Sequence, residues 1–165
     1  MIFWETNKKM PIELHDRLIE YINMQDKFIT TYKNEKWFLN IDGFLDFYDE
    51  LIKEMMLGLG MWTRSKYEFE IWCQCYNNKT QGHEPHEHFS GKEIISFNHI
   101  ITPTKKKCFY FMNDYGNKIY PDKQDSGHFF AWSPWIIHGS DPVEEDNVNR
   151  LIVAGNLVLT DYYAK

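Results

Sequence analysis

The sequence predicts a mainly β fold, an antiparallel sandwich or barrel with helices packed on one side. Three observations support this prediction. The first third of the chain has apolar residues at helical spacing, the rest consists of short β-type runs separated by turn-rich segments, and no repeat or linker interrupts the 165 residues. With 43% hydrophobic residues the chain can fill one core, so we expect a single domain over residues 1–165.

Two helices are predicted in the first third. Pro11 stands at a helix start and apolar residues follow it at helical spacing, which predicts a helix over about residues 11–26. Within residues 44–60 a second apolar stripe ends in glycines, a common helix stop. Residues 1–62 should therefore form a helical support for the rest of the fold.

From Tyr67 onward the pattern is that of strands, which we expect to form a β core over residues 67–160. The predicted strands cover residues 67–76, 93–101, 108–112, 127–132, 135–140 and 150–160. The segments between them are rich in turn residues and are predicted to be connections. One of these, residues 113–127, is long for a strand connection, and we expect it to shape a substrate entrance together with the N-terminal segment.

Composition narrows the function classes. The formal net charge of −6 argues against nucleic acid and anionic membranes as partners. No apolar run is long enough to cross a membrane, and the N-terminus lacks the order of a signal peptide. Three cysteines form no scaffold pattern, so free thiols are expected. We therefore expect a soluble, intracellular protein of the cytoplasm, with an oligomeric state that the sequence leaves open.

A group of histidines is the first candidate site. His83, His86 and His88 lie within residues 81–91, QGHEPHEHFSG, in a chain with seven histidines. His86 and His88 are two residues apart, so on an extended backbone both side chains point to one face and can bind one ion. His138, which follows an apolar run in a later predicted strand, is the best third donor. Three protein ligands would leave coordination positions open, which is typical of a catalytic metal site.

Other interpretations of this segment stay open. Glu84 or Glu87 could replace one imidazole, although Glu87 points away from the histidines on an extended backbone and Pro85 makes the alternation at Glu84 unreliable. His83 is expected to lie behind the ligands or on the surface. The segment could also be a polar loop that binds no metal.

The remaining histidines and the paired cysteines are expected to have structural roles. His15 is predicted on an exposed helix face, and His99 and His128 are predicted strand residues. The face of His99 is not fixed by the sequence. Cys73 and Cys75 share one face of a strand, and we expect them to pack in the core.

Arg150 is the second candidate functional residue. It lies twelve residues after His138 and opens a strand that should bury most of its side chains. Because an unpaired buried guanidinium is costly, the position requires an anionic partner. A cosubstrate with a carboxylate would supply one through bidentate hydrogen bonds.

Taken in order, these motifs resemble the Fe(II)- and 2-oxoglutarate-dependent dioxygenases, specifically the small bacterial and phage group with an H-x-H motif. That group has a W-x-N/Q-x-Y strand before the motif, a Ser-containing strand ending near Pro, a distal His motif and a last strand that begins with Arg. The matching segments here are WCQCY with Trp72, Gln74 and Tyr76, then ISFNHIITP, AWSPWIIHGSDP, and the strand from Arg150 to Asn156. The resemblance runs from about Tyr67 to Leu159.

The resemblance implies a double-stranded β-helix, the jelly roll shared with cupins, and an oxidoreductase that hydroxylates a small molecule or a peptide. It implies Fe(II) bound by His86, His88 and His138, and 2-oxoglutarate bound to the iron and to Arg150 as cosubstrate. These four residues would be the catalytic set. The residues expected to help hold the cosubstrate are Gln74, Tyr76 and Asn156.

The chain also departs from the usual family pattern. The position of the carboxylate ligand is taken by His88, the distal Ser133 and Pro134 are inverted, and Ser96 is followed by Phe97 in place of Gly. A third neutral ligand leaves the iron one charge more positive. The alternatives are therefore a three-histidine cupin-type metal enzyme that uses no 2-oxoglutarate, and a jelly-roll binding protein without chemistry.

Overall fold

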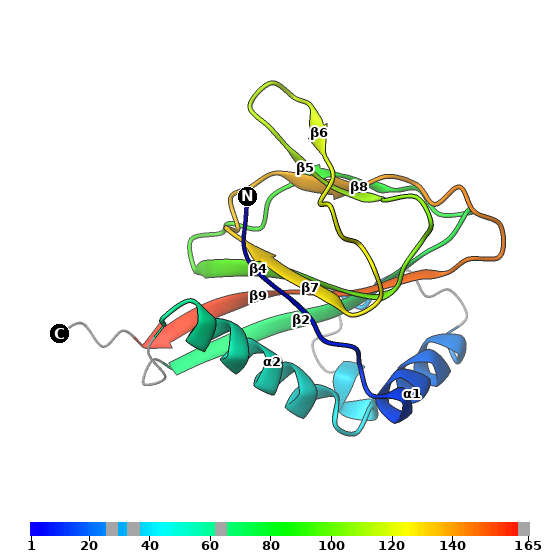
Figure 1. Ribbon diagram of the computed structural model, residues 1–165. Coiled ribbons are helices and arrows are strands. Elements are labelled where there is room, and N and C mark those ends of the chain that lie inside the picture. Colours follow the sequence, from blue (N-terminus) through cyan, green and yellow to red (C-terminus); the bar gives the residue numbers. More distant parts are fainter. Residues whose placement is uncertain (26–29, 33–36, 62–65, 162–165) are drawn as a thin grey trace.

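The structure, a computed structural model, describes residues 1–25, 30–32, 37–61 and 66–161. Two antiparallel sheets lie face to face, and the helices cover the outer face of the larger sheet (Figure 1). The helical elements are α1 (Ile12–Asn23), a 3-10 helix (Trp37–Asn40) and α2 (Phe44–Gly58). The predicted fold class, mainly β with N-terminal helices on one side of an antiparallel sandwich, is confirmed.

The larger sheet has five strands in the order β1-β7-β4-β9-β2. Its strands are β1 (Ile2–Asn7), β2 (Lys66–Tyr76), β4 (Glu93–Thr102), β7 (His128–Trp132) and β9 (Arg150–Asp161). Nearly every residue of β4 is buried, because the helices cover one of its faces and the smaller sheet covers the other. The long antiparallel pair of β2 and β9 fixes which residues of the two strands lie opposite each other.

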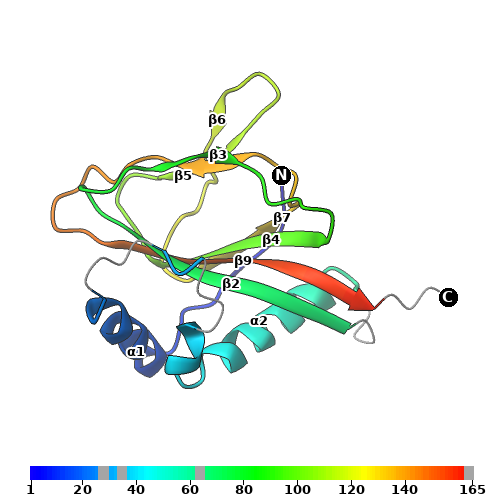
Figure 2. The same cartoon turned by 180° about the vertical axis from the view of Figure 1, so that it is seen from behind.

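The smaller sheet has four strands in the order β3-β8-β5-β6. Its strands are β3 (His83–His86), β5 (Phe109–Met112), β6 (Lys118–Ile119) and β8 (His138–Ser140). The hairpin of β5 and β6 projects from the body of the sandwich (Figure 2). β3 lies at the edge of its sheet, where a strand tolerates Pro85.

Three short strands were not predicted from the sequence. β1 pairs with β7, more than 120 residues away, and no local turn signal marks that pairing. β3 contains a proline and lies in a segment that was assigned to a connection, and β6 is only two residues long. The predicted first helix ends at Asn23, and residue 26 lies outside the described residues.

Alternation along the strands of the larger sheet separates two cores. Side chains such as Cys73, Phe97 and Val153 face the helices, where they pack against residues of α1 and α2. Their strand neighbours face the smaller sheet, where a second cluster contains Phe130 and Ile152. Along each strand, every second side chain belongs to the same cluster, as expected for a sheet that is covered on both faces. The functional candidates on the larger sheet lie on its face toward the smaller sheet.

The predicted packing of Cys73 and Cys75 in a core is confirmed, since both thiols are buried in the helix-facing cluster. None of the helices in the described residues is long and apolar enough to pass through a bilayer.

Candidate metal centre

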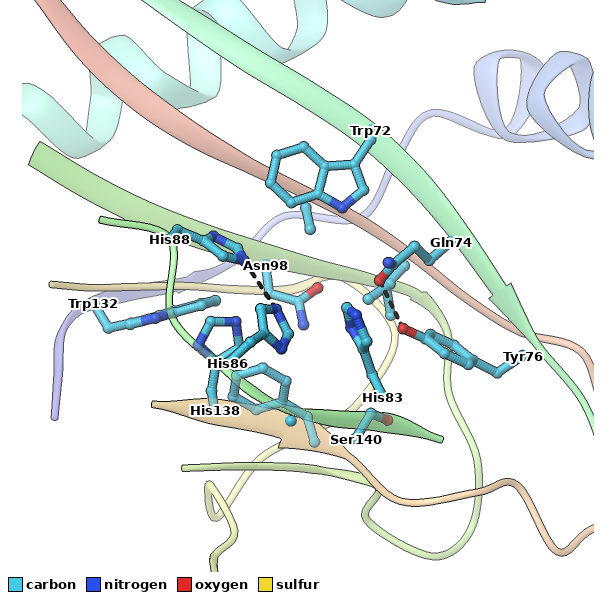
Figure 3. A pocket seen from close by; sticks show the side chains of 14 residues that line it. Trp72, Gln74, Tyr76, His83, His86, His88, Asn98, Trp132, His138 and Ser140 are labelled. Carbon is cyan, nitrogen blue, oxygen red and sulfur yellow. Dashed lines mark hydrogen bonds between the residues drawn. The ribbon is translucent and has the colours of Figure 1, made fainter. Parts of the chain in front are cut away.

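Three histidines of the candidate site meet between the two sheets. His86 ends β3, His138 begins β8, and the register of these strands places the two residues opposite each other. His88 lies two residues beyond β3, where its backbone N–H donates to the carbonyl of Pro134. One ring nitrogen of each histidine lies within 4.8 Å of the others (Figure 3). The structure therefore brings together the three residues that the sequence selected.

Hydrogen bonds fix the ring orientation of His86 and His138. The Nδ1 atom of His86 lies 2.8 Å from the backbone oxygen of Glu84, and the Nδ1 atom of His138 lies 3.0 Å from the backbone oxygen of Ile136. A carbonyl oxygen only accepts, so each Nδ1 must carry the proton. In the neutral ring the Nε2 atom then has a free lone pair, which is the form that binds a metal.

His88 is oriented by a side chain of the larger sheet. Its Nδ1 donates to Oδ1 of Asn156 at 2.9 Å, and the same oxygen accepts from the hydroxyl of Ser96 at 2.8 Å. The Nε2 atom of His88 is thereby left as an acceptor that points at the other two rings. Asn156, expected to help hold a cosubstrate, is here a neighbour of a candidate metal ligand.

The arrangement of the nitrogens fits a cation. Nε2 of His86 lies 3.1 Å from Nε2 of His88, so two lone pairs face each other across a distance at which they repel unless a positive charge lies nearby. Burial lowers the pKa of His88 to about 4 and that of His138 to about 3, which keeps these imidazoles neutral at physiological pH. Three neutral imidazoles on one side of an ion suit Fe(II) or another first-row metal and leave open positions.

The two glutamates of the motif do not join this group of ligands. The cluster of potential ligands formed by the described residues contains His86, His88 and His138 alone. Glu84 contributes its backbone carbonyl to His86, and the side chain of Glu87 is exposed, as the alternation of an extended backbone predicts.

Arg150 lies on the same inner face, six residues before Asn156 on β9. Its side chain is 1% exposed, and its Nη1 donates to the hydroxyl of Ser140 at 3.2 Å. No described residue accepts a hydrogen bond from its Nη2, and no described carboxylate lies within ion-pair distance. The ring of Tyr76 lies 5.4 Å from the guanidinium carbon. Burial lowers the pKa of this arginine, a cost that an anionic ligand would offset.

An inner cavity connects the three histidines with the neighbours of Arg150. Gln74 and Tyr76 line it, joined by a hydrogen bond from the tyrosine hydroxyl at 2.7 Å, and Ser140 lies at the same end (Figure 3). The free volume of about 30 Å³ holds only one or two water molecules, so a larger ligand requires a side chain to move. His83 is the best candidate to move, because its imidazole is exposed on one side and has no hydrogen-bond partner among the described residues.

Two further polar residues line the inner cavity and were missed by the sequence analysis. The amide oxygen of Asn98 and the indole nitrogen of Trp132 are buried and find no hydrogen-bond partner in the described part of the chain. Buried polar groups are nearly always paired, so these atoms are candidate contacts for a ligand. Strand alternation could have placed both on the inner face, since Asn98 lies two residues after Ser96 and Trp132 lies two residues after Phe130.

The structure also places the other histidines. His83 faces the cavity together with His86, because an irregularity between these residues in the pairing with β8 changes the alternation. His99 lies on the helix-facing side, where its Nε2–H donates to the carbonyl of Lys8 and its Nδ1 accepts from the hydroxyl of Tyr48 at 2.8 Å.

His15 lies on α1, and His128 is bonded to Glu5 of β1. Neither histidine lines the inner cavity, in agreement with their expected structural roles.

A larger outer cavity of about 560 Å³ opens onto His83, His86 and His88. Thr30 and Tyr32 of the N-terminal part line it, as expected for an entrance. No described residue of the loop 113–127 lines either cavity, so the expectation that this loop shapes the entrance is wrong for the structure as it stands. The loop instead forms part of the projecting hairpin, and the side-chain amide of Gln124 forms two hydrogen bonds with the backbone of Phe109.

No protein-family model and no curated protein matches the sequence. Solved structures do match. AviO1 from Streptomyces viridochromogenes aligns with a TM-score of 0.68 at 9% identity, over 99% of this chain and 91% of its own. A prolyl-4-hydroxylase from Pseudomonas putida aligns with a TM-score of 0.63 at 12% identity, over 94% of this chain and 91% of its own.

A third match is an oxidoreductase of the 2OG-Fe(II) oxygenase family from Burkholderia pseudomallei, with a TM-score of 0.55 at 13% identity. The alignment covers 72% of this chain and 58% of that protein, so the chain spans little more than half of its length. At such identities a likeness in structure shows the fold. The chain has the jelly-roll fold that the 2OG-Fe(II) oxygenases share.

Proposed function

We propose that this protein is an Fe(II)- and 2-oxoglutarate-dependent dioxygenase that hydroxylates its substrate. One observation carries the proposal: three imidazole Nε2 atoms converge in a cavity that leads toward a guanidinium with no carboxylate partner among the described residues. The first feature calls for a metal cation and the second for an anion, and 2-oxoglutarate bound to iron satisfies both. The shared fold supports this pairing.

In this proposal each residue has a distinct task. His86, His88 and His138 hold the iron through Nε2, while Arg150 and Ser140 hold the distal carboxylate of 2-oxoglutarate. Gln74 and Tyr76 lie beside that end of the cosubstrate, and the apolar walls of the cavity exclude water from the reacting atoms. When bound, Fe(II) and 2-oxoglutarate supply the oxidation, in which dioxygen is consumed and succinate, carbon dioxide and a hydroxylated substrate are formed.

A second candidate function is a three-histidine metal enzyme that uses no 2-oxoglutarate. The observation in its favour is the imidazole of His88 at the position where the oxygenase pattern has a carboxylate. The two functions differ at Arg150, which the second candidate does not need for catalysis.

The deciding experiment is an anaerobic titration of Fe(II) into the apoprotein with 2-oxoglutarate, followed by the visible charge-transfer band of the chelate. We expect the band in the parent protein and in His15→Ala, which alters an exposed histidine of α1, and its loss in His138→Ala. Iron binding without the band would favour the second candidate. Absence of iron binding in the parent would overturn both enzyme proposals.

A further inference from the structure

The outer cavity has an electrostatic character that the proposed function does not explain. Three carboxylates, those of Glu70, Glu87 and Glu93, are among its lining residues, and no described lining residue is a lysine or arginine. Glu93 is bonded to the backbone and hydroxyl of Ser90, whereas the exposed Glu70 and Glu87 form no ion pair with a described residue. Two carboxylates are therefore free to bind a cation.

Alternation along β2 places one of these carboxylates in line with the site. Glu70, Trp72, Gln74 and Tyr76 share the face toward the smaller sheet, so the strand runs from an acidic end to the neighbourhood of Arg150. Six residues of extended chain separate the two ends by about 20 Å. The site is thus polarised, with a guanidinium at the inner end for an anionic cosubstrate and carboxylates at the outer end.

Aromatic rings form the other walls of the outer cavity. Tyr32 packs edge-on against Trp72 with ring centroids 4.9 Å apart, and Phe89, the third aromatic lining residue, packs against Trp135 outside the cavity at 6.0 Å. The rings of Tyr32 and Phe89 are exposed and line this cavity. Aromatic faces next to carboxylates are the environment in which proteins bind ammonium and guanidinium groups.

Trp72 supplies an independent sign of a ligand. Its side chain is 5% exposed and lines both cavities, and none of the described residues accepts a hydrogen bond from its indole N–H. Figure 3 shows the indole nitrogen on the side of the ring that faces the histidines. An indole N–H at the wall of a cavity can donate to a carbonyl oxygen of a bound ligand.

We propose that the substrate of this site is a cationic amide, a lysine- or arginine-bearing peptide or amino-acid amide. Glu70 and Glu87 hold the cationic group against the aromatic wall, and the indole N–H of Trp72 donates to the amide carbonyl. The C–H bond to be oxidised then lies over the three Nε2 atoms. This inference rests on the proposed function for the reaction, but the binding that it describes needs neither iron nor cosubstrate.

The test measures binding to the apoprotein through the indole N–H resonance of Trp72 in ¹⁵N-tryptophan-labelled protein, assigned with Trp72→Phe. The probes are the N-acetyl methylamides of lysine, norleucine and glutamate, added in a buffer of low ionic strength. We expect the lysine probe to bind about tenfold more tightly than norleucine, with glutamate weakest, because the carboxylates are little screened there. Glu70→Gln/Glu87→Gln should abolish the preference for lysine, and Glu13→Gln, an exposed glutamate of α1, should retain it.

Equal binding of lysine and norleucine probes, or no binding of the lysine probe, would overturn the inference. Retention of the preference in the double variant would do the same. These failures are distinct from a failure of the proposed function, which is read from the iron chelate band. A cationic probe that binds to an apoprotein unable to form the band would support the cation site and reject the oxygenase.

Discussion

The two faces of β9 show how one strand serves both stability and function. Leu151 and Val153 face the helices and lie in an apolar cluster that the protein completes by itself. Arg150 and Asn156 face the smaller sheet, where Nη2 of Arg150 has no partner in the described part of the chain and Asn156 orients His88. Because buried polar groups without partners cost free energy, the inner face is incomplete as a core. The difference indicates that a ligand completes the face toward the smaller sheet, whereas the face toward the helices stabilises the fold.

Arg150 and Leu151 are adjacent and lie on opposite faces of β9, so substituting each of them should separate the two roles. We expect the largest effects from these two variants. Arg150→Met removes a buried charge and keeps a similar length, so we expect the free energy of unfolding of the apoprotein to stay equal or rise by about 1–4 kcal/mol. The same variant should lose about 100-fold or more in affinity for 2-oxoglutarate, since charge-assisted hydrogen bonds disappear. Urea denaturation and the anaerobic titration measure the two quantities.

Leu151→Ala is the matched variant on the helix-facing side. We expect it to lower the free energy of unfolding by about 2–5 kcal/mol, because a fully buried leucine leaves a cavity, and to leave cosubstrate affinity unchanged in the folded protein. A strongly destabilised Arg150→Met protein would contradict the comparison, since it would mean that the guanidinium belongs to the core.

Much of the site was predictable because the spacing of residues along single strands indicates which side chains share a face. The i, i+2 spacing of His86 and His88 and the isolated polar His138 identified the three histidines, and the position of Arg150 at the head of an apolar strand identified the buried charge. The helix and strand segments followed from periodicity in the same way. In each case the sequence pattern has the period of the element that forms.

The parts that could not be predicted depend on tertiary pairing. Asn156 contacts His88 across 68 positions, so its role as an orienting acceptor follows from sheet packing, which spacing does not report. His83 faces the cavity because of an irregularity in the β3–β8 register, and the face of His99 depends on contacts with Lys8 and Tyr48. A regular alternation counted along the chain would misplace residues of this kind.

The role of Asn156 gives the next prediction, of intermediate size. Asn156→Ala removes the acceptor that holds His88 with its proton on Nδ1, so we expect Fe(II) affinity to fall about 10- to 100-fold. Calorimetric titration with Fe(II) in the absence of 2-oxoglutarate measures this effect directly. If iron affinity stays unchanged and only the affinity for 2-oxoglutarate falls, Asn156 contacts the cosubstrate, as the sequence resemblance implied, and the orienting role is wrong.

The smallest expected effect concerns a titratable group on the helix-facing side. Burial lowers the pKa of His99 to about 4, and its ring is held between Tyr48 and the carbonyl of Lys8, with His128 as a like charge when protonated. The unfolded chain binds a proton at this residue with a pKa near about 6.5, so the neutral folded form loses stability as pH falls from about 6.5 to 4.

At about pH 5.5 the loss from this one residue should amount to about 1 kcal/mol relative to neutral pH. We expect His99→Gln, which cannot titrate, to show a correspondingly shallower dependence of unfolding free energy on pH, whatever its absolute stability. The comparison requires apoprotein of both variants in urea across this pH range, because the inner-face histidines titrate equally in each and cancel. An unchanged pH slope would place His99 in contact with water and show that the helix-facing layer is open at that point.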